Sequence, residues 1–244
     1  MPVPTRSRLF SLEKLWHSYR VKKPNGKKLI IFDLDGTLYP LVGGSYDSSP
    51  LKRRVLANAV KFISEKLSKS KVEARAVLET VQKKYGEQIS IGLEKDYGLS
   101  RYDYFNTVWN ISTRGIVKKK LALRKVLLEL QKTYTLVLVS DAPQVWIKNV
   151  LAALSVEDIF QDGIFSGEGG RRKGFGNAFS AIVRKYKIRP ADCVAVGDQE
   201  ETDILPAKQL GMRTVFVHPT KLSLVADVNI KSIGELVVTL NFLP

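Results

Sequence analysis

Cysteine and long apolar runs are scarce in this chain of 244 residues, and both shortages restrict what the protein can be. The one cysteine, Cys193, lies in the apolar stretch Cys-Val-Ala-Val, which excludes a disulfide framework and predicts a buried thiol. No stretch approaches the roughly 18 apolar residues of a membrane span, so no membrane partner is expected. No apolar segment follows the basic residues near the N-terminus, so no secretory signal is expected. These features predict a protein of the reducing cytoplasm.

Acidic residues are also in deficit, with 24 Asp and Glu against 39 Lys and Arg. The excess lies in residues 1–28, where eight Lys and Arg face one Glu, and in residues 40–120, where sixteen face eight acids. A basic surface attracts anionic partners, which include phosphorylated small molecules and nucleic acid. No nucleic-acid motif accompanies the charge, so nucleic acid is a possible but not a favoured partner.

Apolar stretches alternate with amphipathic ones over most of the chain, which predicts an α/β fold with a parallel sheet covered on both faces. Residues 50–112 differ because they show only helical spacing, so we expect an all-helical insertion. Its aromatic residues are expected in the core, except for about one in four that face a substrate. The predicted strands are 29–32, 136–140, 163–166, 193–196, 214–217 and one near Val228. The predicted helices are 50–67, 72–85, 102–111, 121–131, 143–154, 178–186, one ending at Leu210, and 232–240.

The stretch Leu29–Tyr39 combines a buried strand with an abrupt change to polar residues at its end. Asp33 and Asp35 follow the strand, Gly36 permits a turn, and Thr37 adds a hydroxyl group. Two neighbouring carboxylates repel each other unless a cation or a shared proton offsets the charge. An ordinary turn would use the same residue types, so this stretch alone leaves both interpretations open.

Polar residues also follow three later strands. Ser140 and Asp141 end one strand, Asp198 ends another with Asp203 five residues on, and Arg171-Arg172-Lys173 lies in the loop after a third. Each could be a helix cap, a first-turn acid or solvated surface. Ligands of open α/β sheets bind at the carboxyl ends of the strands, so the coincidence of all of them favours one shared site.

In this order the four segments resemble the four motifs of the haloacid dehalogenase superfamily of phosphohydrolases. Asp33-Leu34-Asp35-Gly36-Thr37 is the most specific match. The resemblance covers residues 29–240 and is nearest to the subgroup of phosphoglycolate phosphatases and pyrimidine 5′-nucleotidases. It implies a Rossmann-like core of residues 29–40 and 118–244, an inserted helical cap of the C1 type at 41–117, and a basic arm at 1–28.

The resemblance also implies a role for each residue. Asp33 would be the nucleophile, Asp35 the acid and base, and Lys173 the counter-charge. Thr37, Ser140, Asp141 and Lys173 would hold the phosphate group. Mg²⁺ would be bound by the Asp33 and Asp198 carboxylates and the Asp35 backbone carbonyl, with Asp203 either a ligand or just behind the ligands.

Two departures from the family pattern concern the basic loop and the second motif. Gly174 stands where proline is common after the lysine, and Asp141 where asparagine is frequent. Arg171 and Arg172 make the position of the lysine ambiguous, but Phe179 occupies the usual apolar position six residues after Lys173.

The expected function is hydrolysis of a small phosphomonoester, such as a nucleotide, phosphoglycolate or a sugar phosphate, through an aspartyl-phosphate. A dehalogenase is disfavoured because those enzymes lack the acid at the position of Asp35. A phosphomutase, a nucleic-acid-end phosphatase and a non-catalytic binding protein remain alternatives. The protein is expected to be a monomer or a homodimer.

Overall fold

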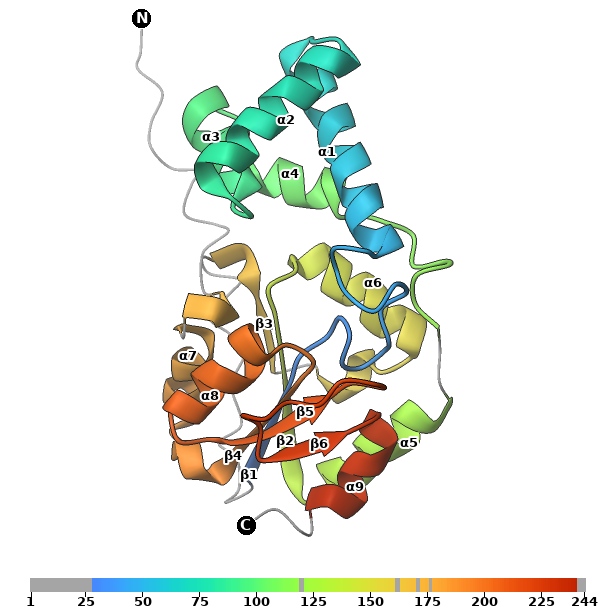
Figure 1. Cartoon of the computed structure of the whole chain (residues 1–244), viewed down its shortest axis with the longest axis vertical. Helices are drawn as coiled ribbons and strands as arrows, with labels where there is room; N and C mark the ends of the chain where they lie inside the picture. The colour runs from blue at the N-terminus through green and yellow to red at the C-terminus, as the bar shows by residue number, and fades with distance from the viewer. Residues whose placement is uncertain (1–27, 119–120, 161–162, 170–171, 176, 241–244) are drawn as a thin grey trace, which may run out of the picture.

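The computed structural model describes residues 28–118, 121–160, 163–169, 172–175 and 177–240, and it is built on one six-stranded sheet (Figure 1). All pairs of neighbouring strands are parallel, in the order β3-β2-β1-β4-β5-β6. This arrangement confirms the predicted α/β fold. The predicted basic arm lies, except for Lys28, outside the described residues. The strands are β1 (Lys28–Phe32), β2 (Tyr134–Ser140), β3 (Ile164–Ser166), β4 (Cys193–Gly197), β5 (Arg213–Val217) and β6 (Val228–Ile230).

The sheet separates two apolar cores, because successive residues of a strand point to opposite faces. Ile30 and Phe32 of β1 belong to one core, and Leu29 and Ile31 belong to the other. The first core is covered by α5 (Leu121–Gln131), α6 (Gln144–Leu154) and α9 (Leu236–Thr239), and the second by α7 (Asn177–Tyr186) and α8 (Leu205–Gln209). Burial on both faces explains why the strands are continuous apolar runs. Cys193 is buried on β4, as predicted.

Four helices are inserted between β1 and β2 and pack together at one end of the molecule (Figure 1). They are α1 (Pro50–Leu67), α2 (Lys71–Tyr85), α3 (Ile89–Tyr97) and α4 (Arg101–Val108), and together they are called the helical insertion. The hydroxyls of Ser49, Ser70 and Ser100 accept backbone N–H groups at the starts of α1, α2 and α4, at 3.2, 3.3 and 3.2 Å. Each such cap stabilises its helix by about 1 kcal/mol.

The helical insertion differs from the prediction in two respects. Helix α3 was not predicted, because its interior Gly92 and irregular apolar spacing weaken the helical pattern. A Cβ at Gly92 would lie 2.5 Å from the Tyr85 ring, so close packing of α3 against α2 requires this glycine. The prediction that the aromatic residues are core was wrong for Tyr102, which is 72% exposed, whereas Tyr104 of the same helix is buried.

Two predicted helices of the core are shorter than expected. After β4, the turn η6 (Glu200–Ile204) has π-helical hydrogen bonding and precedes the short α8, where Pro206 occupies the first turn. Proline lacks a backbone donor and suits the start of a helix. The predicted helix at 232–240 is a 3₁₀ turn, η7 (Ile233–Glu235), followed by one turn of α9.

Candidate active site

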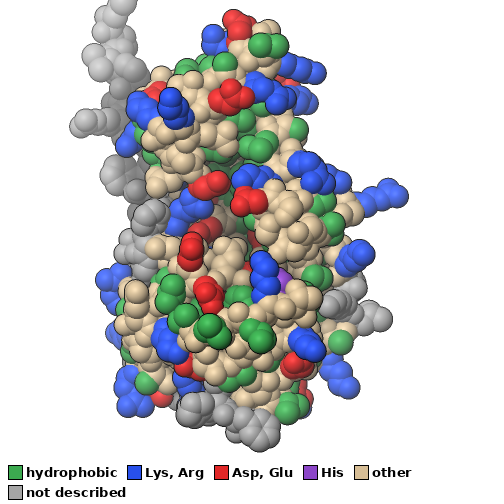
Figure 2. Space-filling model, in the orientation of Figure 1, with side chains coloured by type: hydrophobic (Ala, Val, Ile, Leu, Met, Phe, Trp, Pro, Cys, Tyr) green, Lys and Arg blue, Asp and Glu red, His purple; other side chains and the backbone are tan. Residues whose placement is uncertain are grey.

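A cavity of about 860 Å³ lies between the helical insertion and the carboxyl ends of the strands. Figure 2 shows this face of the molecule hollowed between its two parts, with acidic and basic side chains around the hollow. The core contributes Asp33, Asp35, Ser140, Lys173 and Asp198 to the cavity wall. Parallel strands end at one edge of the sheet, so residues far apart in the sequence meet here.

Asp33 is buried directly after β1, and both of its carboxylate oxygens accept hydrogen bonds. The Thr37 hydroxyl donates to Oδ2 at 3.0 Å, and the Lys173 ammonium donates to Oδ1 at 2.5 Å. The Asp33 backbone N–H donates to the Val196 carbonyl at 2.9 Å, which fixes the residue against β4. The carboxylate is therefore anchored by charged and neutral donors beside the cavity that it lines.

The turn after Asp35 brings the backbone against Asp198. Gly36 has φ +100°, a conformation that glycine adopts readily and other residues avoid. A Cβ at this position would lie 2.1 Å from the Asp198 carboxylate oxygen Oδ2. Two backbone hydrogen bonds close the turn, from Leu38 N–H to the Leu34 carbonyl at 3.0 Å and from Gly36 N–H to the Tyr39 carbonyl at 3.1 Å.

Lys173 is the basic residue of the loop that reaches the centre of the site. Its side chain is buried, and the ammonium lies 2.5 Å from Asp33 and 2.6 Å from Asp203. Burial disfavours its charge, but the Asp203 and Asp33 carboxylates outweigh burial, and the pKa of Lys173 is raised above its ordinary value. Arg172 instead lies 3.6 Å from the Asp141 carboxylate, and Arg171 is outside the described residues.

Asp203 is held behind Lys173 by the turn η6. Its Oδ1 accepts from the Lys173 ammonium at 2.6 Å, and its Oδ2 accepts from the Gln199 backbone N–H at 3.1 Å. Gly197 permits this approach, since a Cβ there would lie 2.3 Å from the Asp203 side chain. Both oxygens of Asp203 are thus already occupied by donors.

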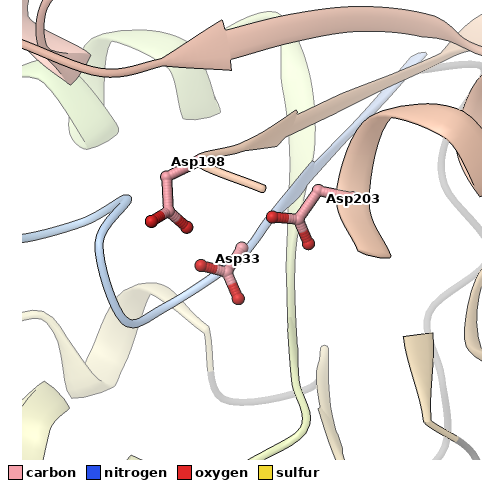
Figure 3. A group of neighbouring side chains, drawn as sticks. All are labelled: Asp33, Asp198 and Asp203. Carbon is pink, nitrogen blue, oxygen red and sulfur yellow. The ribbon is translucent and has the colours of Figure 1, made fainter. Parts of the chain in front are cut away.

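The carboxylates of Asp33, Asp198 and Asp203 turn toward one another, with oxygen atoms within 4.8 Å (Figure 3). The Asp198 atom Oδ1 is enclosed and has no hydrogen-bond partner within the described part of the chain. Burial and then the charges of Asp33 and Asp203 raise the pKa of Asp198. An enclosed carboxylate oxygen beside other carboxylates suits a hard divalent cation with oxygen ligands. The residues therefore fit a metal ion.

Asp35 has surroundings unlike those of Asp33. Its Oδ1 accepts from the Trp146 indole N–H at 2.8 Å and from the Tyr39 hydroxyl. Burial raises the pKa of Asp35 to about 6, although these two hydrogen bonds lower it. A carboxyl group with such a pKa can both give and accept a proton near neutral pH.

Ser140 and Asp141 follow β2 at the edge of the cavity. The Ser140 hydroxyl oxygen accepts the Ala142 backbone N–H at 3.1 Å, which leaves its proton free to be donated. The Asp141 carboxylate accepts the Lys173 backbone N–H at 2.8 Å. The Asp141 side chain thereby fixes the start of the Lys173 loop.

Reasoning from the sequence did not identify Tyr39 or Trp146 as part of the site. Tyr39 could have been suspected, because it closes the motif that begins at Asp33. Trp146 shows no such signal, since its helical spacing is that of a core residue and its partner Asp35 is 111 residues away. The cavity-lining residues of the insertion, which include Lys52, Arg101 and Trp109, were also not singled out.

No helix among the described residues is long and apolar enough to cross a membrane.

Comparison with known proteins gives consistent matches. A curated relative, the glyceraldehyde 3-phosphate phosphatase of Pyrococcus furiosus, is 26% identical over 87% of this chain and 89% of its own. The human N-acylneuraminate-9-phosphatase is 24% identical over 86% of this chain and 92% of its own. The crystal structure of a HAD phosphatase from Thermococcus onnurineus has the same fold, with a TM-score of 0.62 and 22% identity over 87% of this chain and 97% of that one. The family model of the haloacid dehalogenase-like hydrolases matches residues 27–211, and the chain belongs to that family.

Proposed function

We propose that this protein is a Mg²⁺-dependent phosphatase that hydrolyses a small phosphomonoester through an aspartyl-phosphate on Asp33. The observation that carries the proposal is the environment of Asp33, whose two oxygens are held by Thr37 and Lys173 at the cavity surface. A fixed carboxylate beside a buried ammonium can attack phosphorus, because the ammonium offsets the charge of the incoming phosphoryl group. The curated relatives described above are also named as phosphatases.

The proposed reaction uses the two aspartates of the first motif in turn. Asp33 attacks phosphorus and forms a P–O bond while the ester P–O bond breaks, and Asp35 gives its proton to the departing alcohol. Asp35 then takes a proton from water, whose oxygen attacks the aspartyl-phosphate and releases inorganic phosphate and free Asp33. Lys173 and the Ser140 hydroxyl donate to the phosphoryl oxygens throughout.

We propose that Asp33, Asp198 and the backbone carbonyl of Asp35 hold the Mg²⁺ ion. When bound, the ion offsets the negative charge of the phosphoryl oxygens and of the carboxylates. Asp203 acts one step away from it, because Asp203, unlike Asp33 and Asp198, does not line the cavity and instead holds the Lys173 ammonium at 2.6 Å.

We propose that residues 41–117 form a cap that covers the cavity and excludes water while Asp33 is phosphorylated. Arg101 of α4 already joins the two parts, since it donates to the Glu168 carbonyl at 3.0 Å. The cavity has room beyond the phosphate position, and the insertion offers Lys52 and Arg101 to an oxygen-rich substrate. A phosphorylated sugar or sugar acid therefore fits better than a phosphate on a purely apolar group.

The test is phosphate release from a panel of phosphomonoesters that includes sugar phosphates, triose phosphates, phosphoglycolate and nucleotides. Purified protein with Mg²⁺ should release inorganic phosphate from at least one, without forming an isomer, and EDTA should stop the reaction until Mg²⁺ is restored. Asp33→Asn should show no release. Asp158→Asn removes a surface carboxylate that pairs with Arg124, and it should retain full activity. Full activity of Asp33→Asn would contradict the mechanism.

A further inference from the structure

Two buried aromatic side chains hold the same oxygen atom of Asp35. The Trp146 indole and the Tyr39 hydroxyl both donate to Oδ1, and both side chains are at most 1% exposed. They come from different elements, Tyr39 from the turn after β1 and Trp146 from α6, 111 residues beyond Asp35. The Asp35 carboxyl group is therefore fixed by hydrogen bonds from two separate elements.

The other oxygen of Asp35, Oδ2, has a different environment. No described residue donates to Oδ2, and Oδ2 is not among the enclosed polar atoms without a partner, so it is open to the cavity that Asp35 lines. A proton on Oδ1 would face two donor hydrogens at once. The proton of the acid form therefore resides on Oδ2, the oxygen that a substrate can reach.

We propose that Tyr39 and Trp146 are positioning residues that hold Asp35 by Oδ1, so that Oδ2 delivers its proton to the leaving oxygen. This inference rests on the proposed phosphatase function and assigns to that site two residues outside the motif acids. Proton delivery requires the donor and the leaving oxygen to be within hydrogen-bond reach during P–O cleavage. If the carboxyl group of Asp35 could rotate, its protonated oxygen would face the leaving oxygen only part of the time.

A structural explanation competes with this one, because a buried tyrosine or tryptophan normally needs a partner for its polar atom. The two explanations differ in which substrates are affected. An alkyl alkoxide is a poor leaving group and needs the proton of Asp35, whereas 4-nitrophenolate departs without it. Loss of positioning therefore slows alkyl phosphates selectively, while general loosening of the site slows both kinds of ester.

The experiment compares kcat/KM for an alkyl phosphate, the best sugar phosphate of the panel, with kcat/KM for 4-nitrophenyl phosphate, both with saturating Mg²⁺. The variants are Tyr39→Phe, which removes only the hydroxyl, and Trp146→Phe, which removes the indole N–H. Asp35→Ala removes the acid itself and so sets the largest difference expected between the losses on the two esters. Tyr134→Phe, at the opposite end of β2, controls for loss of a tyrosine hydroxyl elsewhere in the core.

For each positioning variant, kcat/KM for the alkyl phosphate should fall roughly tenfold through a lower kcat, which is a part of the 10²- to 10⁴-fold that a general acid contributes. The value for 4-nitrophenyl phosphate should change less than about twofold. Tyr134→Phe should leave both values unchanged. Equal losses on the two esters, or no loss on the alkyl ester, would overturn this inference and leave the phosphatase proposal intact. A wild-type protein that hydrolyses neither ester would overturn both.

Discussion

Gly36 lies in the turn between Asp35 and Thr37, where the backbone passes directly against the Asp198 carboxylate. Its φ of +100° strains any other residue, and the space for a Cβ is already taken by Asp198 Oδ2 at 2.1 Å. Asp198 could relieve this contact only by leaving its present position beside Asp33. At this position the Asp198 carboxylate packs directly against the backbone, where no side chain can be accommodated.

Gly36→Ala should therefore remove most of the activity. The backbone strain is expected to destabilise the fold by about 1 kcal/mol, and displacement of Asp198 should lower kcat about a hundredfold. The matched control is Gly211→Ala, because Gly211 also has a positive φ, +84°, but a Cβ there would contact nothing within 4 Å. Thermal unfolding should show similar losses of stability for both variants, whereas kcat should fall only in Gly36→Ala. Equal activities would show that the Asp198 contact is unimportant.

At the scale of the element, the turn η6 carries Asp203 back toward the end of β4. The Asp203 backbone N–H donates to the Gln199 carbonyl at 3.0 Å, and the Asp203 carboxylate accepts the Gln199 backbone N–H at 3.1 Å. This reciprocal pair fixes the carboxylate where it meets Lys173. The π-helical turn thus serves to place one acid, which explains why a regular helix does not start at this point.

Asp203→Asn should impair the reaction more than it impairs metal binding. The amide keeps the shape of the side chain but loses the charge that holds the Lys173 ammonium, so kcat should fall about a hundredfold. Mg²⁺ affinity, measured by calorimetric titration, should fall at least about tenfold further in Asp198→Asn than in Asp203→Asn. The reverse order of Mg²⁺ affinities would identify Asp203 as a ligand.

The sequence was sufficient to predict the parallel sheet and to bring Asp33 and Asp198 together, because strand ends of a parallel sheet meet at one edge. The sequence was not sufficient to predict α3, which has a weak helical pattern and packs closely against α2 at Gly92 and Tyr85. It also could not reveal the bond between Trp146 and Asp35, since helical periodicity marks Trp146 only as a core residue. Contacts that depend on how an insertion or a helix docks have no local signal in the sequence.

At the scale of the whole molecule, acidic side chains are concentrated where the core meets the helical insertion. Asp33 and Asp203 pair with the Lys173 ammonium, and their carboxylates lie close to that of Asp198. Asp35 lines the same cavity as Asp33 and Asp198. Burial raises the pKa of Asp35, Asp198 and Asp203 above ordinary values. Without a cation, folding therefore favours protonation of these groups.

The sign of the resulting pH dependence follows from these raised pKa values. A group whose folded-state pKa exceeds its unfolded value stabilises the fold below the unfolded pKa, and that stability is lost as pH rises through the folded pKa. For Asp35 the pKa changes from 3.8 to about 6. That change corresponds to a loss of about 3 kcal/mol between about pH 4 and about pH 8 in the metal-free protein.

Thermal unfolding in EDTA should therefore show a Tm that falls as pH rises from about 5 to about 8. Added Mg²⁺ should raise the Tm more at the higher pH, because the cation competes with protons for the same oxygens. Asp198→Asn removes one of these groups and one metal ligand, so it should flatten both trends while other titrating groups, such as His218, behave as in the wild type. Comparison of the two proteins by calorimetry over this pH range isolates the contribution of the site. An increment from Mg²⁺ that is the same at both ends of the range, or equal in the two proteins, would show that the carboxylate cluster does not bind the ion.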